Sequence, residues 1–110
     1  MSDLVSIVIA NYNYAEFLSE SIRSAQQQTY SNIEIIYIDD GSTDNSLEIA
    51  REFDITILSQ QNQGVCAARN NAVEFAKGKY ILFLDADDIL MPNAVEHLYH
   101  LMKTSDPDVG

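Results

Sequence analysis

Short apolar runs rich in β-branched residues alternate along the chain with segments whose apolar residues recur at helical spacing. The apolar runs predict four β-strands, at residues 5–10, 33–38, 55–59 and 80–84. One helical segment follows each strand, so the predicted order of elements is βαβαβαβα. Such alternation is typical of an α/β fold with a mostly parallel sheet.

Each predicted helix has one apolar face that should turn towards the sheet. Pro92 should open the last helix, because proline suits the first helical turn. The residues expected to face inwards are Phe17, Leu18, Ile22 and Ala25 in the first helix, Leu47, Ala50 and either Phe53 or Ile49 in the second, Val65, Ala68, Ala72 and Phe75 in the third, and Val95, Leu98, Leu101 and Met102 in the fourth.

The predicted strands are apolar on both faces, which indicates a Rossmann-like sheet flanked by helices on both sides and joined by right-handed crossovers. Ligands of such sheets bind beyond the carboxyl ends of the strands. We expect residues 1–110 to form one domain at most. Because the chain closes on a turn followed by a valine, we interpret it as the N-terminal portion of a larger domain.

The charge of the chain narrows the set of partners. Seventeen acidic and six basic residues give a formal net charge of -11, which argues against nucleic-acid binding because phosphate contacts require clustered Lys and Arg. The same charge would repel a nucleoside diphosphate unless a divalent cation lay between carboxylates and phosphates.

No apolar run reaches the roughly 18 residues of a membrane span and no basic leader precedes the first strand, so we expect a cytoplasmic location. Cys66 stands alone and is interpreted as a small buried thiol.

Three carboxylates follow the fourth predicted strand. Asp85, Asp87 and Asp88 come directly after a buried run, where uncompensated charges would be costly. Three interpretations are open: residues solvated at the edge of the sheet, acceptors for a ligand that donates hydrogen bonds, or oxygen ligands for a hard cation such as Mg²⁺ or Mn²⁺. We favour the cation or the ligand over the solvated edge. A second Asp-x-Asp pattern, at Asp106 and Asp108, is interpreted as a solvated turn.

Acidic residues also follow the second predicted strand. In the segment DDGSTDNS (39–46), the glycine predicts a turn and the Ser, Thr or Asp after it predicts a helix N-cap. Capping leaves the adjacent Asp39 and Asp40 without a role. One of these two carboxylates should therefore face donors such as a ribose hydroxyl pair or a base N–H.

The sequence allows two roles for each of several further residues. Arg69 is either a surface residue that extends past alanines or a cation that reaches a phosphate at the sheet edge. Tyr12 and Tyr14 either stack on a nucleobase or pack against the protein. His97 and His100 are spaced as metal ligands could be, but we interpret them as surface residues.

The ordered motifs VSIVIANYN, EIIYIDDGSTDNS, NQGVCAARNNA and GKYILFLDADDILMP resemble the nucleotide-binding half of an inverting family 2 glycosyltransferase with the GT-A fold. The likeness spans nearly all of the chain. It implies transfer of a sugar from a nucleoside-diphosphate sugar, commonly a UDP-sugar, to a saccharide or lipid-linked acceptor. It also implies Mg²⁺ or Mn²⁺ on the diphosphate and a role in bacterial cell-surface polysaccharide synthesis.

The resemblance assigns nucleotide-binding roles by position. Asp40 resembles the residue that hydrogen-bonds the uracil, with Asp39 beside it. The backbone near Ala10 and Tyr12 should line the base pocket. Asn11 departs from the many relatives that have proline or another small residue before the Tyr-Asn pair, and this departure bears on the shape of the pocket.

The resemblance also assigns the diphosphate and metal contacts. Arg69 resembles the basic residue near the base and diphosphate, Asp85 the acid near the ribose and metal, and Asp87 the acid that ligates the metal, with Asp88 in support. The general base of an inverting transfer has no counterpart here, so we expect binding with hardly any turnover. Apolar surface that the rest of such a domain would cover could also lead to self-association.

The main alternative is an Mg²⁺-binding, receiver-like signalling domain. It would require its acidic pair after the first strand and a lysine after a fifth strand, whereas here a whole strand precedes Asp39. A phosphatase of the haloacid-dehalogenase type would place its Asp-x-Asp on the first core strand. A dinucleotide-binding oxidoreductase would have a glycine-rich turn where this chain has ANYNYAEF.

Overall fold

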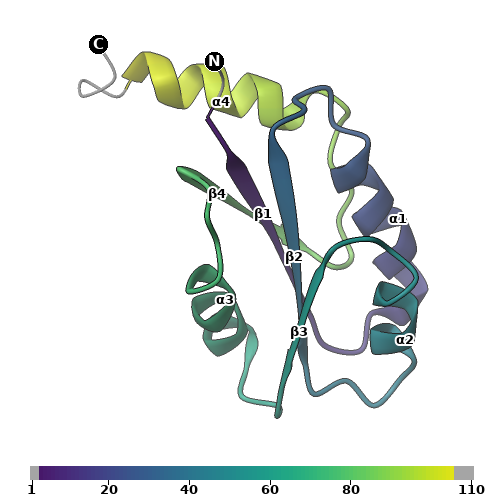
Figure 1. The fold of residues 1–110 in the computed structure, drawn as a ribbon. Helices are drawn as coiled ribbons and strands as arrows, with labels where there is room; N and C mark the ends of the chain where they lie inside the picture. The colour runs from purple at the N-terminus through teal and green to yellow at the C-terminus, as the bar shows by residue number, and fades with distance from the viewer. Residues whose placement is uncertain (1–2, 106–110) are drawn as a thin grey trace.

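The computed structural model describes residues 3–105, and Figure 1 shows their fold. Strands and helices alternate throughout this range, which confirms the predicted order. The elements are β1 (Val5–Asn11), α1 (Ala15–Gln26), β2 (Ile33–Asp40), α2 (Ser46–Ala50), β3 (Thr56–Gln60), α3 (Val65–Val73), β4 (Tyr80–Asp85) and α4 (Ala94–Ser105). The interpretation of Asp106 and Asp108 as turn residues falls outside the described range.

The four strands form one parallel sheet in the order β3-β2-β1-β4. The chain therefore builds outwards from β1 to β3 and then crosses to the other side of β1. In open α/β sheets, ligands bind where the order reverses in this way, which places the expected site at the carboxyl ends of β1 and β4. The receiver-like alternative is wrong, because receiver domains have the strand order 2-1-3-4-5.

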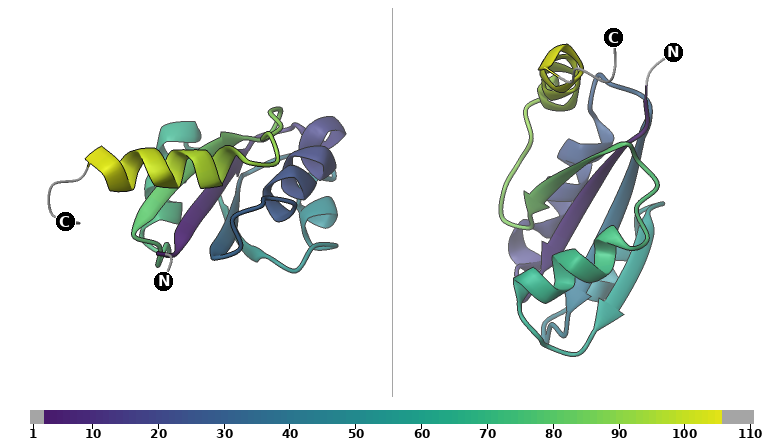
Figure 2. Two further views of the ribbon diagram at one scale, coloured as in Figure 1. Left: turned by 90° about the horizontal axis from the view of Figure 1, so that it is seen from above. Right: turned by 90° about the vertical axis from the view of Figure 1, so that its left-hand side faces the viewer.

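Helices cover the two faces of the sheet unequally (Figures 1 and 2). α1, α2 and α4 pack on the face that carries Ile7 and Ile9, and α3 packs on the opposite face against Val8 and Ile36. This arrangement confirms the predicted sheet with helices on both sides. It also leaves part of β4 open on the α3 face, where Phe83 is 45% exposed.

The helix faces agree with the sequence only in part. In α1, Leu18, Ile22 and Ala25 are fully buried, but Phe17 is half-exposed and its ring lies beside that of Tyr14. The prediction for Phe17 was wrong because one helical step of about 100° turns it away from the stripe that meets the sheet.

In α3 the small residues Ala68 and Ala72 are buried, whereas Val65 and Phe75 are exposed. The helix ends at Val73, before it could turn Phe75 inwards. Two alanines allow the helix backbone to approach the sheet closely, and this contact needs no larger side chain. Cys66, on the same helix, is exposed rather than buried because it lies two residues before Ala68, about 200° around the helix and therefore on the opposite face.

In α4 the inward residues are Val95 and Tyr99, four positions apart. The predicted inward residues Leu98, Leu101 and Met102 are 38%, 54% and 45% exposed. The helix passes the amino-terminal ends of the strands, as Figure 1 shows, so only a narrow stripe meets the core. It begins at Ala94, two residues after Pro92.

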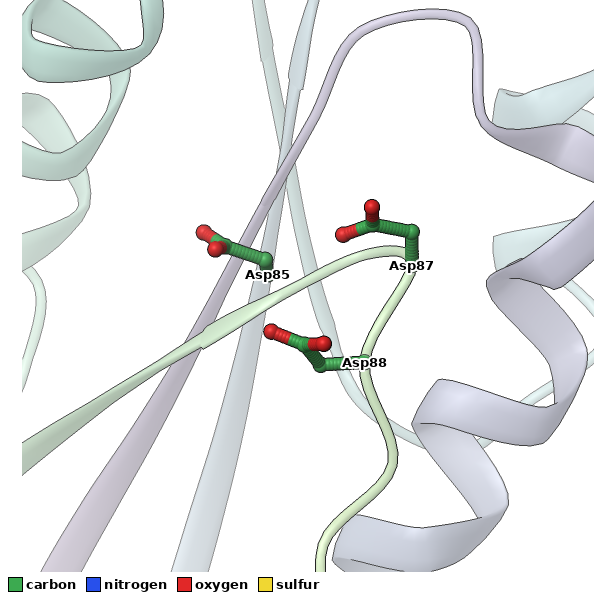
Figure 3. Close-up of side chains that lie close together, drawn as sticks. All are labelled: Asp85, Asp87 and Asp88. Carbon is green, nitrogen blue, oxygen red and sulfur yellow. The ribbon is translucent and has the colours of Figure 1, made fainter.

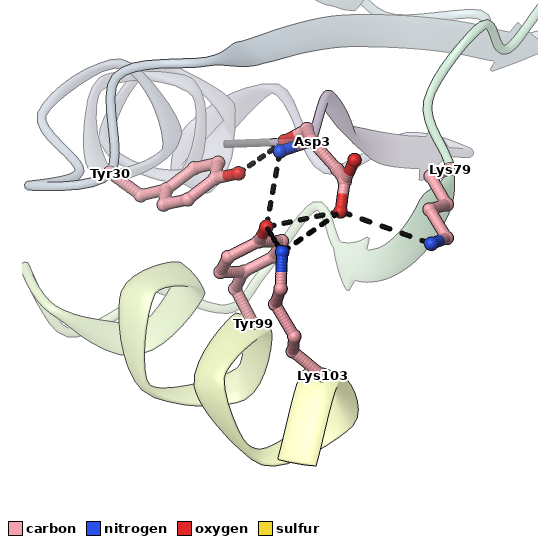
Figure 4. Close-up of polar contacts among 5 residues, drawn as sticks. All are labelled: Asp3, Tyr30, Lys79, Tyr99 and Lys103. Carbon is pink, nitrogen blue, oxygen red and sulfur yellow. Dashed lines mark hydrogen bonds and ion pairs between the residues drawn. The ribbon is translucent and has the colours of Figure 1, made fainter. Parts of the chain in front are cut away.

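A polar cluster holds α4 at the amino end of the sheet (Figure 4). The Tyr99 hydroxyl donates to the Asp3 carboxylate over 3.0 Å, and the Tyr30 hydroxyl donates to the Asp3 carbonyl. Lys79 and Lys103 each lie 4.0 Å from the same carboxylate. α4 is thus held by polar contacts as well as by its apolar stripe.

Within residues 3–105, no helix combines the length and apolar character that crossing a membrane would require.

Replacing Leu18 with alanine should lower the free energy of unfolding by about 2–5 kcal/mol, because a fully buried side chain leaves a cavity. The neighbouring Phe17→Ala should cost less than about 1 kcal/mol, since that ring is half in solvent. Urea unfolding followed by circular dichroism measures both. Equal losses would contradict the orientation of α1.

Candidate functional site

The register of the sheet brings the polar strand ends to one edge. Asn11 lies opposite Asp39, Ala10 lies opposite Asp85, and β2 ends at Asp40. The hydrogen-bonded ladder thus runs through residues that the apolar pattern placed beyond the strands. The expected convergence of the candidate residues at the carboxyl edge is confirmed.

Asn11 is a buried connector between β1 and β2. Its Nδ2 donates to the Tyr37 hydroxyl over 2.9 Å and lies 3.5 Å from the Asp39 Oδ1. Its Oδ1 accepts the Tyr14 backbone N–H over 3.0 Å, at the start of α1. A proline here would provide none of these contacts, so Asn11 shapes the chain that follows β1.

Asp39 is almost fully buried, and protein groups donate to both of its oxygens. The Tyr37 hydroxyl donates to Oδ1 over 2.6 Å, and the Ser42 backbone N–H donates to Oδ2 over 2.8 Å. Burial raises the pKa of Tyr37, and its hydrogen bond to Asp39 raises it further. Asp39 therefore fixes the turn after β2, and its predicted nucleotide contact stays a prediction.

The loops after β1 and β2 are hydrogen-bonded to each other through Asn13. Its Oδ1 accepts the backbone N–H groups of Thr43 and Asp44 over 2.8 and 3.3 Å. Its own N–H donates to the Ser42 hydroxyl over 2.9 Å. Asn13 has a φ of 61°, a left-handed conformation that asparagine tolerates better than most residues. The position of Asn13 directly after β1 predicts its place at the carboxyl edge of the sheet, but no sequence pattern predicts its hydrogen bonds to the loop after β2.

Asp44 serves the first turn of α2. Its Oδ1 accepts the Ser46 backbone N–H over 3.0 Å, and its Oδ2 accepts the Ala15 N–H of α1 over 3.1 Å. Burial acts to raise the pKa of Asp44, but the hydrogen bonds from Ser46 and Ala15 outweigh it and lower the pKa. Of the three predicted capping residues, Asp44 is the one that accepts a helical amide.

Asp40 is 1% exposed and organises the loop between β3 and α3. Its Oδ1 accepts the Gln60 side chain and the Gln63 N–H, each over 2.8 Å. Its Oδ2 accepts the Gly64 N–H over 3.0 Å and the Asn62 side chain over 3.2 Å. Burial acts to raise the pKa of Asp40, but the donors at Gln63, Gln60 and Gly64 outweigh it and hold the pKa below its usual value.

Asp85, Asp87 and Asp88 form an exposed acidic cluster at the end of β4 (Figure 3). One carboxylate oxygen of each lies within 4.8 Å of the others. The Asp88 N–H donates to the Asp85 carbonyl over 2.9 Å, which closes the turn that brings the side chains together. Exposed oxygen ligands with open positions fit a hard cation such as Mg²⁺ or Mn²⁺.

Among residues 3–105, this cluster is the one group of three His, Cys, Asp or Glu side chains close enough to share a metal ion. His97 and His100 are exposed and belong to no such group. Their interpretation as surface residues is confirmed.

Arg69 reaches from α3 to the carboxyl end of β4. Its Nη2 lies 2.5 Å from the Asp85 Oδ1, and its guanidinium carbon lies 5.6 Å from the centre of the Phe83 ring. Arg69 thus extends to the sheet edge, as one of its two interpretations required. Sequence reasoning missed Phe83, although it lies two residues before Asp85 and therefore on the same face of β4.

Tyr12 and Tyr14 are 39% and 44% exposed beside this edge. Neither residue is buried, and the Tyr14 ring lies beside that of Phe17. The stacking of these tyrosines on a nucleobase stays a prediction. The backbone of Ala10 lies between β2 and β4, at the strand that both neighbours share.

Comparison with known proteins identifies the family of the chain. The family described as glycosyl transferase family 2 matches residues 6–109. The glycosyltransferase GlyG of Streptococcus pneumoniae serotype 4 is 44% identical over 99% of this chain and 38% of its own length. The Escherichia coli protein named UDP-Glc:alpha-D-GlcNAc-diphosphoundecaprenol beta-1,3-glucosyltransferase WfaP is 42% identical over 93% of this chain and 42% of its own length. The chain thus spans about two-fifths of these relatives.

Solved structures show the same fold. Residues 1–349 of Staphylococcus aureus TarS, in complex with UDP, match 94% of this chain with a TM-score of 0.83 and 23% identity. The mannosyltransferase PcManGT of Pyrobaculum calidifontis, in complex with GDP-Man and Mn²⁺, matches 97% with a TM-score of 0.84 and 22% identity. The chain covers 32% and 34% of those two structures. The predicted GT-A type of α/β fold is confirmed.

Asp40→Asn should lower the free energy of unfolding at pH 7 by about 1–3 kcal/mol, because an amide cannot accept all four donors. The folded pKa of Asp40 lies below the unfolded value of about 3.9, so its carboxylate contributes fully above that value. The contribution disappears as the pH falls through the folded pKa.

Urea unfolding of both proteins at pH 7 and in increasingly acidic buffer measures this difference, which should narrow with falling pH. Asp54→Asn, at an exposed position, is the charge-matched control and should change stability by less than about 0.5 kcal/mol. A difference between wild type and Asp40→Asn that stays constant with pH would count against the hydrogen-bonded carboxylate.

Proposed function

The chain belongs to glycosyl transferase family 2, and from that premise we propose that its carboxyl edge binds the nucleoside diphosphate of a sugar donor, a UDP-sugar, together with Mg²⁺ or Mn²⁺. The whole protein would transfer the sugar to an acceptor hydroxyl with inversion. Residues 1–110 would be the N-terminal, nucleotide-sugar-binding portion of that domain.

The observation that carries this proposal is the position of the acidic cluster. It lies at the end of β4, beside the point where the strand order reverses, and the partly exposed Arg69 contacts one of its carboxylates. A cation held there would neutralise the diphosphate and stabilise it as a leaving group. Asp87 and Asp85 would be its protein ligands, with Asp88 beside them.

The base would lie over the ends of β1 and β2. In this proposal the backbone at Ala10 and Tyr12 lines the base pocket, and Asp39 and Asp40 face the uracil side. Because both oxygens of Asp40 accept protein donors, a base N–H would share an oxygen with a loop amide or replace the Gln60 side chain.

Arg69 would contact the diphosphate. It already lies over the edge of the sheet, and its planar fork of donors suits phosphate oxygens. The carboxylates alone would repel such a ligand, so a divalent cation and this arginine together provide the positive charge that the site requires.

The general base of the reaction is not among the residues to which we give a role. An inverting transfer requires a general base that deprotonates the acceptor hydroxyl, and no described residue is given that role. We propose a saccharide or lipid-linked acceptor and a cytoplasmic reaction, at the inner face of the membrane. The name of WfaP includes a diphosphoundecaprenol-linked substrate for that protein.

Surface exposure supports one further part of the proposal. Phe83, Leu101 and Met102 are large apolar residues that are each at least 45% exposed. On its own the chain would associate with itself through such surfaces.

Binding of UDP should depend on Mn²⁺, and Asp87→Ala should weaken it by at least about tenfold, because even groups that only support metal ligands contribute that much. Titration calorimetry with UDP, GDP and ADP, each with and without Mn²⁺, measures this. Asp54→Ala removes the same charge from an exposed position two residues before β3 and should leave binding unchanged.

Equal binding with and without Mn²⁺ would remove the metal from the proposal. Equal losses in Asp87→Ala and Asp54→Ala would show a general charge effect. Tighter binding of GDP or ADP than of UDP would overturn the choice of base.

A further inference from the structure

Two residues of β4 contact the Arg69 side chain. Phe83 and Asp85 lie two positions apart, so their side chains project from the same face of the strand. The guanidinium carbon lies 5.6 Å from the Phe83 ring centre, while Nη2 lies 2.5 Å from Asp85 Oδ1. The ring and the carboxylate together define where the arginine lies.

The carboxylate alone is a weak anchor. The side chains of Arg69 and Asp85 are 33% and 52% exposed, and ion pairs this exposed to solvent contribute little stability. The Phe83 ring adds a flat surface on which the guanidinium can stack through a cation–π contact.

Phe83 lies outside the packed core. It is 45% exposed, and it does not belong to either group of packed core residues. α3 covers β1 and β2 through Ala68 and Ala72, and Arg69 extends from it towards β4. Within residues 3–105, this exposed ring contacts the Arg69 guanidinium.

Asp85 is also part of the acidic cluster. A cation on that cluster and the guanidinium on Asp85 Oδ1 would be like charges a few ångströms apart, and they would repel each other. The arginine therefore competes with a metal ion for the same carboxylate. A diphosphate beside the metal would offer Arg69 new acceptors.

We propose that Phe83 is a positioning residue that holds Arg69 on Asp85 until metal and diphosphate arrive and then keeps it aligned with the diphosphate. This inference rests on the proposed function. If the inference is right, changing Phe83 alters two affinities in opposite directions: the affinity for Mn²⁺ alone and the affinity for UDP at saturating Mn²⁺. A residue with a purely structural role would change both affinities in the same direction.

Phe83→Leu keeps apolar volume and removes the aromatic ring. Its affinity for Mn²⁺ alone, measured by electron paramagnetic resonance of the free ion, should rise about two- to five-fold, since that is the factor that a cation–π contact at an exposed site supplies. Its affinity for UDP at saturating Mn²⁺, measured by calorimetry, should fall by a similar factor. Phe83→Tyr keeps the ring and should match the wild type in both.

A second comparison isolates the arginine. Arg69→Gln should bind Mn²⁺ alone more tightly, and adding Phe83→Leu to it should change nothing further. Changes in the same direction for both ligands, or a Phe83→Leu effect that persists without Arg69, would overturn the inference. If the wild type binds no Mn²⁺, the proposed function itself fails, which is a separate result.

Discussion

Two buried carboxylates at the end of β2 must each find hydrogen-bond donors, and the loops around the carboxyl edge are arranged to supply them. A buried carboxylate without donors would cost several kcal/mol, about as much as a large core truncation. Asp39 takes its donors from Tyr37 and from the turn after β2, and Asp40 takes one from the end of β3 and three from the β3–α3 loop. Asn11 and Asn13 then join the loop after β1 to this arrangement. The conformation of three loops thus follows from satisfying these two side chains.

The same edge contains a second set of carboxylates that are exposed to solvent instead of buried. Asp85, Asp87 and Asp88 are exposed and lie close together, and of their carboxylate oxygens the described contacts place one against Arg69. Buried, satisfied acids give the edge its shape, while exposed acids remain available to a cation. This division explains why adjacent Asp-Asp and Asp-x-Asp patterns in one chain have different physical roles. The fold fixes the first set before any ligand is present.

The sequence predicted the order of elements, the sheet and the edge at which the candidate residues meet, because these depend on period and alternation. It failed where a helix meets the sheet through few residues. α3 contacts the sheet through Ala68 and Ala72, so its large apolar residues did not need to turn inwards, and α4 contacts it through Val95 and Tyr99. The contact between Arg69 and Phe83 depends on the distance between α3 and β4, which no local pattern encodes. Likewise, the donors of Asp40 come from residues 20 or more positions away.

The distribution of positive charge explains why the acidic edge would require a cation. The chain has six basic residues against seventeen acidic ones. Lys79 and Lys103 lie beside Asp3, at the opposite end of the strands, and Arg23 lies over the Phe53 ring. Arg69 brings a single charge to the edge, and it is placed against a carboxylate. A diphosphate carries more than one negative charge, so one arginine cannot balance both it and the acidic cluster. In the proposed function, a divalent ion on the cluster would change that balance by two charges next to the acidic residues, and it would release the arginine for the phosphate.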